Sequence, residues 1–271
     1  MTAIQTDHIS FKIDYFQLHD LSLSIPSRKI TSIVGPNGSG KSTLLKIISK
    51  LLTADDGSVY VQNVNTKKYK TKEFAKTIAM LPQSKDALPN LTVKELVSFG
   101  RSPYKQFLYN RSNGEDERII NEAMEMTNTT KHKEHLFYHL SGGEQQKVRL
   151  AMALAQKTDI LLLDEPTTYL DIAHQFELME LLQQINEDHQ MTIIMVLHDL
   201  QQAASYSDYM IALKNGSLVD TGFPKKMLTA AFLHNVYDIN ARIIFEEGYP
   251  LIIPKIRRNK DVYCHKHNEN K

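Results

Sequence analysis

The segment from residue 30 to residue 52 constrains the fold of this chain more than any other. Residues 30–34 form a short, mostly apolar and β-branched run, which leads directly into the glycine-rich loop Gly35-Pro-Asn-Gly-Ser-Gly-Lys-Ser42. Helical spacing is expected from Leu44 to Leu52. A strand, a glycine-rich loop and a helix in this order form the phosphate loop of nucleotide-binding proteins. The sequence therefore predicts an α/β fold that binds nucleotide phosphates at the start of this helix.

The loop contains the residue types that phosphate binding requires. Its backbone N–H groups point at the phosphates, and the positive end of the following helix adds to their attraction. Glycines are needed because a Cβ atom would block the close approach of the backbone. Lys41 is expected to bridge the β- and γ-phosphates, and Ser42 to offer its hydroxyl to Mg²⁺. The predicted loop residues that contact nucleotide are Gly35, Asn37, Gly38, Ser39, Gly40, Lys41 and Ser42.

Two apolar runs, 160–163 and 193–197, are separated by a helix expected at about 173–188. Runs that are apolar on both faces and alternate with helices indicate a buried parallel sheet. Asp164 and Glu165 follow the first run, at the strand end where ligands bind in α/β sheets. Asp164 is expected to hold Mg²⁺ through water.

Capping boxes begin two further helices. Thr92-Val-Lys-Glu95 predicts one helix, and Ser141-Gly-Gly-Glu144 predicts another that runs to about Gln156. Residues 115–127 carry helical spacing between these boxes, so residues of about 88–139 are predicted to be a helical insertion. Near the N-terminus, residues 21–25 alternate apolar and polar residues, which is typical of a half-exposed strand.

The five residues Leu140-Ser-Gly-Gly-Glu144 lie after a complete phosphate loop and shortly before Asp164 and Glu165. This combination resembles the ATP-binding subunits of ABC (ATP-binding cassette) transporters, and the resemblance runs from about Ile9 to Pro254. It implies a P-loop NTPase fold, the ABC cassette, with a RecA-like core, an N-terminal antiparallel β-subdomain and a helical subdomain at about 88–156. The expected organisation is one ATPase domain over residues 1–254 and a basic tail over 255–271.

The resemblance implies roles for single residues. Glu165 matches the catalytic base that polarises the attacking water, and His198, 33 residues later, matches the switch histidine that contacts the γ-phosphate. Gln83, in Met80-Leu-Pro-Gln83, matches the Q-loop glutamine that meets Mg²⁺ and the attacking water. Thr43 is expected to contact the α-phosphate.

Members of this family bind ATP between two copies arranged head to tail. Ser141, Gly142 and Gly143 are therefore expected to face the γ-phosphate held by the other copy, although the serine can equally serve as a plain helix cap. Asp171 matches the D-loop that crosses the dimer interface. An aromatic residue of the first hairpin usually stacks on adenine. Several aromatic residues compete in Phe11-Lys-Ile-Asp-Tyr-Phe16, and Tyr15 is favoured among them, although an aromatic residue at strand spacing can equally belong to the core.

The segment Asp164-Glu-Pro-Thr-Thr-Tyr-Leu-Asp-Ile-Ala-His-Gln175 resembles the ATPases of bacterial importers for ferric siderophores, haem and cobalamin. Residues 97–103, 151–156 and 236–254 are similar to the same subfamily. The implied partners are two membrane permease subunits and, indirectly, an extracytoplasmic binding protein, with ATP and Mg²⁺ as cofactors. Ferric siderophores are the favoured cargo, ahead of haem and then cobalamin. A manganese or zinc importer would keep the same fold and chemistry.

The composition of the chain limits where in the cell it is expected to act. No apolar run approaches the ~18–20 residues of a membrane span, the first residues lack the pattern of a signal peptide, and the single cysteine, Cys264, fits a reducing cytosol. We expect a peripheral protein at the cytoplasmic face of the cell membrane. The net charge of +1 gives no electrostatic case for nucleic acid. Cys264, His265 and His267 lack a second ligand pair at zinc-like spacing.

Two rival functions fit the sequence less well. Soluble ABC proteins that act on ribosomes usually carry two cassettes, and those that act on DNA carry a long coiled-coil insertion, whereas this chain has neither. A regulator that does not hydrolyse ATP would not need Gln83, Glu165 and His198 together. Lysines cluster in residues 67–76, and basic residues recur in the tail. These charges indicate either a solvated face or contact with anionic lipid beside a membrane partner.

Overall fold

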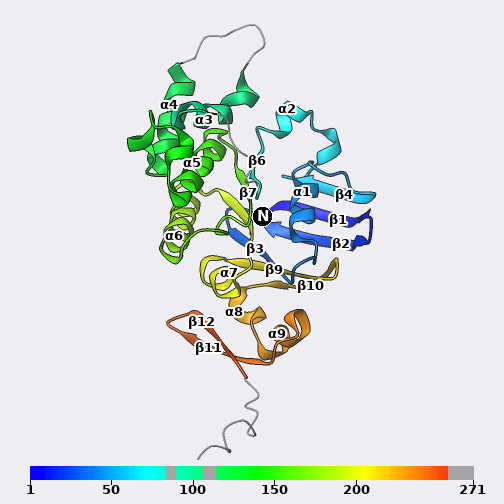
Figure 1. The fold of residues 1–271 in the computed structure, drawn as a ribbon. Coiled ribbons are helices and arrows are strands. Elements are labelled where there is room, and N and C mark those ends of the chain that lie inside the picture. The colour runs from blue at the N-terminus through cyan, green and yellow to red at the C-terminus, as the bar shows by residue number, and fades with distance from the viewer. Residues whose placement is uncertain (84–89, 106–113, 256–271) are drawn as a thin grey trace, which may run out of the picture.

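A six-stranded sheet forms the centre of the computed structural model, which describes residues 1–83, 90–105 and 114–255 (Figure 1). The strand order is β10-β9-β3-β8-β7-β6, and all neighbours are parallel except β9 and β10. β3, β7 and β8 are buried along their whole length, which confirms the predicted parallel sheet. The strands are β3 (Ile30–Val34), β6 (Ile78–Leu81), β7 (Ile160–Asp164), β8 (Thr192–Val196), β9 (Tyr209–Lys214) and β10 (Ser217–Gly222).

A four-stranded antiparallel sheet, ordered β2-β1-β4-β5, lies beside this core. In β2 the apolar residues Leu21, Leu23 and Ile25 are buried and the residues between them are exposed, so the predicted half-exposed strand is confirmed. These side chains share one apolar cluster with α1 and with one face of the central sheet. The strands are β1 (Thr2–Ile13), β2 (Phe16–Pro26), β4 (Asp56–Val61) and β5 (Val64–Asn65).

The helix after the phosphate loop, α1 (Lys41–Ile48), begins and ends earlier than the sequence suggested. Ser49 closes it by donating its N–H to the last turn, and Lys50 then adopts a left-handed backbone with φ of 60°. A left-handed residue cannot continue a right-handed helix. The expectation of a helix to Leu52 was therefore wrong by one turn.

Helices gather at one end of the molecule, drawn in green in Figure 1. α3 (Val93–Ser98), α4 (Gly114–Met126) and α5 (Gly142–Ala155) pack on one another, and both predicted capping boxes are present. α6 (Ile172–His189) agrees with the predicted helix to within one residue at each end. Part of the predicted insertion lies outside the described residues. Shorter elements are α2 (Thr71–Phe74), η1 (Thr66–Lys68), η2 (Phe99–Tyr104), η3 (Thr130–His132) and η4 (Phe137–His139).

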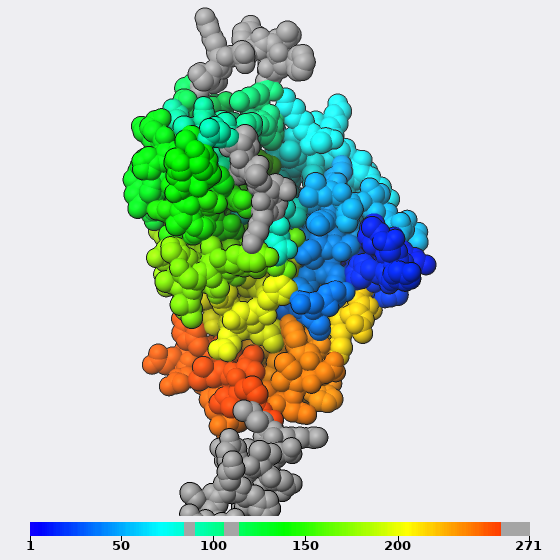
Figure 2. Space-filling model, viewed as in Figure 1, coloured from blue at the N-terminus to red at the C-terminus, as the bar shows by residue number. Residues whose placement is uncertain are grey.

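The last segment packs at the opposite end, drawn from yellow through orange to red in Figure 2. It comprises α7 (Leu200–Tyr206), α8 (Pro224–Met227), α9 (Ala230–Tyr237), β11 (Ala241–Glu246) and β12 (Tyr249–Pro254). Phe232, Leu233 and Val236 of α9 belong to the same apolar cluster as α5, α6 and the other face of the central sheet. Of the proposed basic tail only Lys255 is described, so the domain boundary at residue 254 stays a prediction, and Cys264, His265 and His267 lie outside the described residues.

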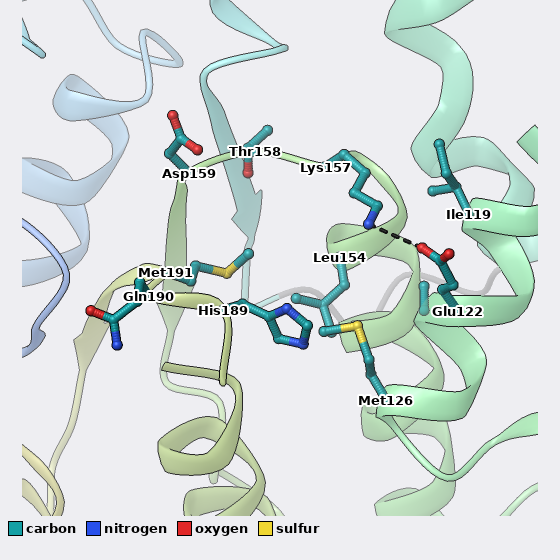
Figure 3. A pocket seen from close by; sticks show the side chains of 11 residues that line it. Ile119, Glu122, Met126, Leu154, Lys157, Thr158, Asp159, His189, Gln190 and Met191 are labelled. Carbon is teal, nitrogen blue, oxygen red and sulfur yellow. Dashed lines mark ion pairs between the residues drawn. The ribbon is translucent and has the colours of Figure 1, made fainter. Parts of the chain in front are cut away.

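A small cavity of about 200 Å³ separates α4 from the ends of α5 and α6 (Figure 3). Met126, Leu154 and Met191 contribute apolar walls, and Lys157 forms an ion pair with Glu122 at 3.0 Å beside them. None of the residues predicted to bind nucleotide lines this cavity.

Two features of the described residues concern contact with a membrane. Among the residues described, none of the helices has both the length and the apolar character needed to span a bilayer. The clustered lysines Lys67, Lys68, Lys70, Lys72 and Lys76 are all exposed, as both a solvated face and contact with anionic lipid require.

Candidate nucleotide site

The phosphate loop closes around the side chain of Lys41. The ammonium group donates hydrogen bonds to the carbonyl oxygens of Gly35 at 2.9 Å and Pro36 at 3.0 Å, and the residue is only 5% exposed. Burial lowers the pKa of Lys41, although Glu165 and Asp164 nearby act in the opposite direction. Within the described residues, the buried hydroxyl of Ser39 has no hydrogen-bond partner. The loop therefore carries a cation and a free polar group directed into its own interior, as an anion site requires.

Gly40 shows why this loop needs glycine. Its φ of +100° is unfavourable for residues with a Cβ atom. An added Cβ would also lie 2.4 Å from Cδ2 of Leu18 and 2.8 Å from Cζ of Phe16. The loop can thus come close to β2 only with glycine at this position.

Ser42 and Asp164 meet across the site. The Ser42 hydroxyl donates a hydrogen bond of 2.7 Å to Oδ1 of Asp164, which ends β7 and is only 4% exposed. Burial raises the pKa of Asp164, while the hydrogen bond from Ser42 partly opposes that rise. A hydroxyl and a carboxylate are the oxygen ligands that Mg²⁺ prefers, so these two residues fit the predicted metal role.

The three predicted catalytic residues lie together, with Glu165 in contact with both Gln83 and His198. Its carboxylate accepts a hydrogen bond from the amide of Gln83 and contacts Nε2 of His198. The hydroxyl of Thr168 adds a hydrogen bond of 3.1 Å. Gln83 follows β6, Glu165 follows β7 and His198 follows β8, and these strands are neighbours in the sheet. Their roles were assigned from separate motifs, and the fold brings the three side chains together.

The backbone of Glu165 is unusual. Its φ of 52° lies in the left-handed region, which is costly for a residue with a side chain. Such conformations cluster at functional sites, where the surrounding structure enforces them. Here the left-handed residue directly follows β7, and its side chain lines the cavity beside the phosphate loop.

That cavity has a volume of about 570 Å³. It unites the loop with the residues at the strand ends, and its lining is formed by Phe16, Asn37, Gly38, Gly40, Lys41, Ser42, Thr43, Glu165 and His198. Gln83 reaches it indirectly, through its bond to Glu165. The cavity therefore has the phosphate loop on one side and a carboxylate and an imidazole among its other lining groups.

Tyr15, the aromatic residue favoured for adenine, is not among the residues that line the cavity. It is fully exposed at the turn between β1 and β2, whereas the next residue, Phe16, faces the loop. Successive residues of a strand point to opposite faces, and Phe16 shares its face with buried Leu18. The sequence contained this signal in the alternation of β2, but the position of the turn decided which aromatic residue faced inward.

The residues expected to act on the other copy's nucleotide lie elsewhere. Ser141 and Gly142 are exposed at the start of α5, where the serine hydroxyl and Glu144 form the capping box. Gly143 packs on the ring of His174, and Nδ1 of His174 lies 2.8 Å from the carboxylate of Asp171. A hydrogen bond from the backbone N–H of His174 lowers the pKa of Asp171. None of these residues lines the cavity of its own chain.

The fold and the cavity together define a phosphate-loop nucleotide site in an α/β protein. Residues 18–168, more than half of the chain, match the family model described as ABC transporter. The chain is 46% identical over 245 residues to the iron(3+)-hydroxamate import ATP-binding protein FhuC of Bacillus subtilis (strain 168), covering 90% of this chain and 91% of that protein. It is 42% identical to the ferric enterobactin transport ATP-binding protein FepC of Escherichia coli (strain K12), covering 89% of each.

Solved structures of ABC transporter proteins share the fold of this chain. A dimeric bacterial ABC transporter cassette, MJ0796, has a TM-score of 0.71 at 31% identity, covering 82% of this chain and 98% of that one. An ABC transporter solved in an inward-facing conformation reaches 0.82 at 23% identity over 95% of this chain and 99% of that one, and at that identity it shows the fold alone. The chain belongs to the ATP-binding proteins of the ABC transporter family.

Proposed function

We propose that this chain is the ATP-hydrolysing subunit of a bacterial importer for ferric siderophores. The observation that carries the proposal is the single cavity onto which Lys41, Ser42, Glu165 and His198 converge. The names of its relatives, which describe import of iron chelates, point to the cargo. The geometry of the site supports ATP hydrolysis, and the similarity to named relatives supports ferric siderophores as the cargo. The two parts of the proposal are therefore tested separately.

ATP binding would begin by opening bonds that the loop now makes with itself. Lys41 must exchange the carbonyl oxygens of Gly35 and Pro36 for phosphate oxygens. The exchange is favourable because hydrogen bonds from a cation to an anion are stronger than those to a neutral carbonyl. The loop N–H groups and the start of α1 would bind the remaining phosphate charge.

Mg²⁺ would be held by the hydroxyl of Ser42 and, through water, by Asp164, with Gln83 beside them. When bound, the ion neutralises charge on the β- and γ-phosphates. Ser42 and Asp164 are already within hydrogen-bonding distance of each other, so this pair needs only small movements to present both oxygens.

Hydrolysis would use Glu165 as the base. Its carboxylate orients a water molecule and accepts its proton as the oxygen bonds to the γ-phosphorus, while the bond from that phosphorus to the bridging oxygen breaks and ADP leaves. Because Gln83 and His198 now occupy both oxygens of this carboxylate, they must turn toward nucleotide and water before it can act. His198 would then contact the γ-phosphate.

A second copy would complete each site. Ser141, Gly142, Gly143 and Asp171 lie away from their own chain's cavity, and we infer that they serve the nucleotide of a copy arranged head to tail. The solved MJ0796 cassette is dimeric, which supports the pairing of two copies. The pair would dock, as a peripheral complex at the cytoplasmic face, on two permease subunits that receive cargo from an extracytoplasmic binding protein.

Ferric siderophores are the best-supported cargo. Besides hydroxamate and enterobactin, the names of relatives at 41–43% identity mention petrobactin and achromobactin. Haem, cobalamin and manganese or zinc ions are the remaining alternatives, because the same ATPase chemistry would serve them equally. No residue of the nucleotide site needs to contact the cargo.

Growth of a deletion strain in iron-depleted medium tests this proposal. Each culture receives one iron source: a hydroxamate, a catecholate or a carboxylate siderophore, haem, or a ferric salt. We expect loss of growth on at least one siderophore class, restored by the wild-type chain but not by an equally expressed Glu165→Gln variant. Unchanged growth on every siderophore, with loss of cobalamin or metal-ion uptake instead, would contradict the cargo assignment.

A further inference from the structure

The C-terminal hairpin presents an apolar face away from the body of the molecule. β11 and β12 pair with each other in a two-stranded antiparallel sheet, with Ile243 opposite Ile252 and Ile244 opposite Leu251. Directly opposed residues of such a ladder lie on the same face. Ile243 and Ile252 pack on the main core, and β12 lies against α7. Ile244 and Leu251 must therefore point outward.

The outward face combines apolar residues with charges at its ends. Along β11 it carries Arg242, Ile244 and Glu246, and all three are exposed. Their partners on β12 complete the face, and they are Ile253, Leu251 and Tyr249 in the same order. Ile244 is 41% exposed, Leu251 38% and Tyr249 57%. An exposed apolar strip between polar ends is typical of an interaction surface.

The face is complementary to itself. Arg242 and Glu246 lie two positions on either side of Ile244, about 13 Å apart along the strand, too far to pair within one copy. Two copies can be packed face to face about a two-fold axis that lies between the faces, parallel to the sheets and at right angles to the strands. This axis would place Ile244 on Ile244 of the second copy and Leu251 on Leu251 of that copy. The same operation places each Arg242 on Glu246 of the other copy. A two-fold interface requires this self-matching, because one patch must serve both sides.

We propose that this face, formed by Arg242, Ile244, Glu246, Tyr249, Leu251 and Ile253, binds the same face of a second copy. The contact buries the apolar strip and forms two symmetrical ion pairs at its ends. It involves no residue of the phosphate loop, of 141–143 or of Asp171, so it does not depend on bound ATP. Such a contact keeps two copies associated when the nucleotide sites are empty.

Sedimentation of the purified full-length chain without nucleotide, over a range of concentrations, tests the proposal. We expect self-association, weakened at least about tenfold by Arg242→Glu or Glu246→Arg, because each reversal replaces both opposite-charge pairs with like-charge pairs. The double variant with both charges reversed should restore the wild-type association. Glu125→Arg, a reversal on exposed α4, is the matched control and should have no effect.

Three outcomes overturn the proposal: a wild-type chain that stays monomeric without nucleotide, association unaffected by either reversal, or a double variant that remains as weak as the single ones. A chain shortened after Lys255 tests another occupant of the face. Association that emerges only in this shortened chain would assign the face to residues 256–271 instead. ATP-dependent pairing of the Glu165→Gln variant is measured separately, so a failure of the proposed function is distinguishable from a failure of this contact.

Discussion

The hydroxyl of Ser42 donates a hydrogen bond of 2.7 Å to the carboxylate of Asp164, 122 residues further along the chain. Ser42 belongs to the first turn of α1, and Asp164 is the last residue of β7. The bond joins the phosphate loop to the strand that carries the catalytic carboxylate. It also gives the buried Asp164 a polar partner in a setting where an unsatisfied carboxylate would be costly.

Ser42→Ala should lower both stability and Mg²⁺-dependent ATP binding. Removing the donor leaves the buried carboxylate of Asp164 without this partner, which should reduce the free energy of unfolding by about 1–3 kcal/mol. Urea unfolding measures the first effect, and ATP titration with and without Mg²⁺ measures the second. Ser42→Thr keeps the hydroxyl and serves as the control. If Mg²⁺ strengthens ATP binding to the alanine variant as much as to wild type, Ser42 is not a metal ligand.

Asp164→Asn should stabilise the nucleotide-free protein at neutral pH while abolishing hydrolysis. Burial raises the pKa of Asp164 above its ordinary value of 3.8, so the folded chain keeps this proton at pH values where the unfolded chain has lost it. The free energy of unfolding therefore falls as the pH rises from 3.8 through the raised pKa. Asparagine does not ionise, so the variant avoids this fall in the free energy of unfolding. Urea unfolding at several pH values should show an advantage for the variant that shrinks toward pH 3.8, and a less stable variant at neutral pH contradicts the argument.

Gly142 and Gly143 should respond differently to alanine. A Cβ on Gly143 would lie 2.2 Å from Cδ2 of His174, and we expect a loss of about 1–3 kcal/mol in the free energy of unfolding. A Cβ on Gly142 meets nothing within 4 Å, so Gly142→Ala should fold as stably as wild type. Reduced ATPase activity in a fully stable Gly142→Ala variant would support its action on the other copy. Wild-type activity in that variant would remove Gly142 from the site.

Phe16 rather than Tyr15 should stack on the adenine ring. Phe16 lines the cavity and Tyr15 does not, so Phe16→Ala should weaken ATP binding by about 1–3 kcal/mol, a typical value for one stacked base. Tyr15→Ala should have little effect. Inorganic tripolyphosphate, which lacks a base, is the control ligand and should bind both variants as it binds wild type. The opposite ranking of the two variants in ATP titrations would restore Tyr15 to this role.

The sequence predicted the parts of the site that depend on local order. Strand, loop and helix follow one another in the phosphate loop, and the apolar runs before Glu165 and His198 place both residues at strand ends. In a parallel sheet the carboxyl ends of the strands lie at the same edge, independently of the structure of the connecting segments. This explains why Glu165 and His198 could be placed at strand ends from their own segments, whereas Gln83 was assigned only through the family resemblance.

Other features depend on geometry that the motifs do not contain. The choice of Phe16 over Tyr15 depends on a turn at Asp14, whose φ is 49°, because shifting this turn by one residue would reverse which side chains face inward. The early end of α1 follows from the left-handed backbone of Lys50. The packing of Gly143 on His174 joins segments with no pattern in common. Such features arise from tertiary packing, which overrides local propensity.

Turnover of ATP by the Glu165→Gln variant tests the central claim most directly. Glutamine keeps the shape of the side chain but cannot accept the proton from water, so we expect hydrolysis to fall by about 10²–10⁴-fold. ATP binding should be retained, and ATP should hold two copies of the variant together during size-exclusion chromatography. Undiminished turnover would show that Glu165 is not the base and would contradict the mechanism built on its position between Gln83 and His198.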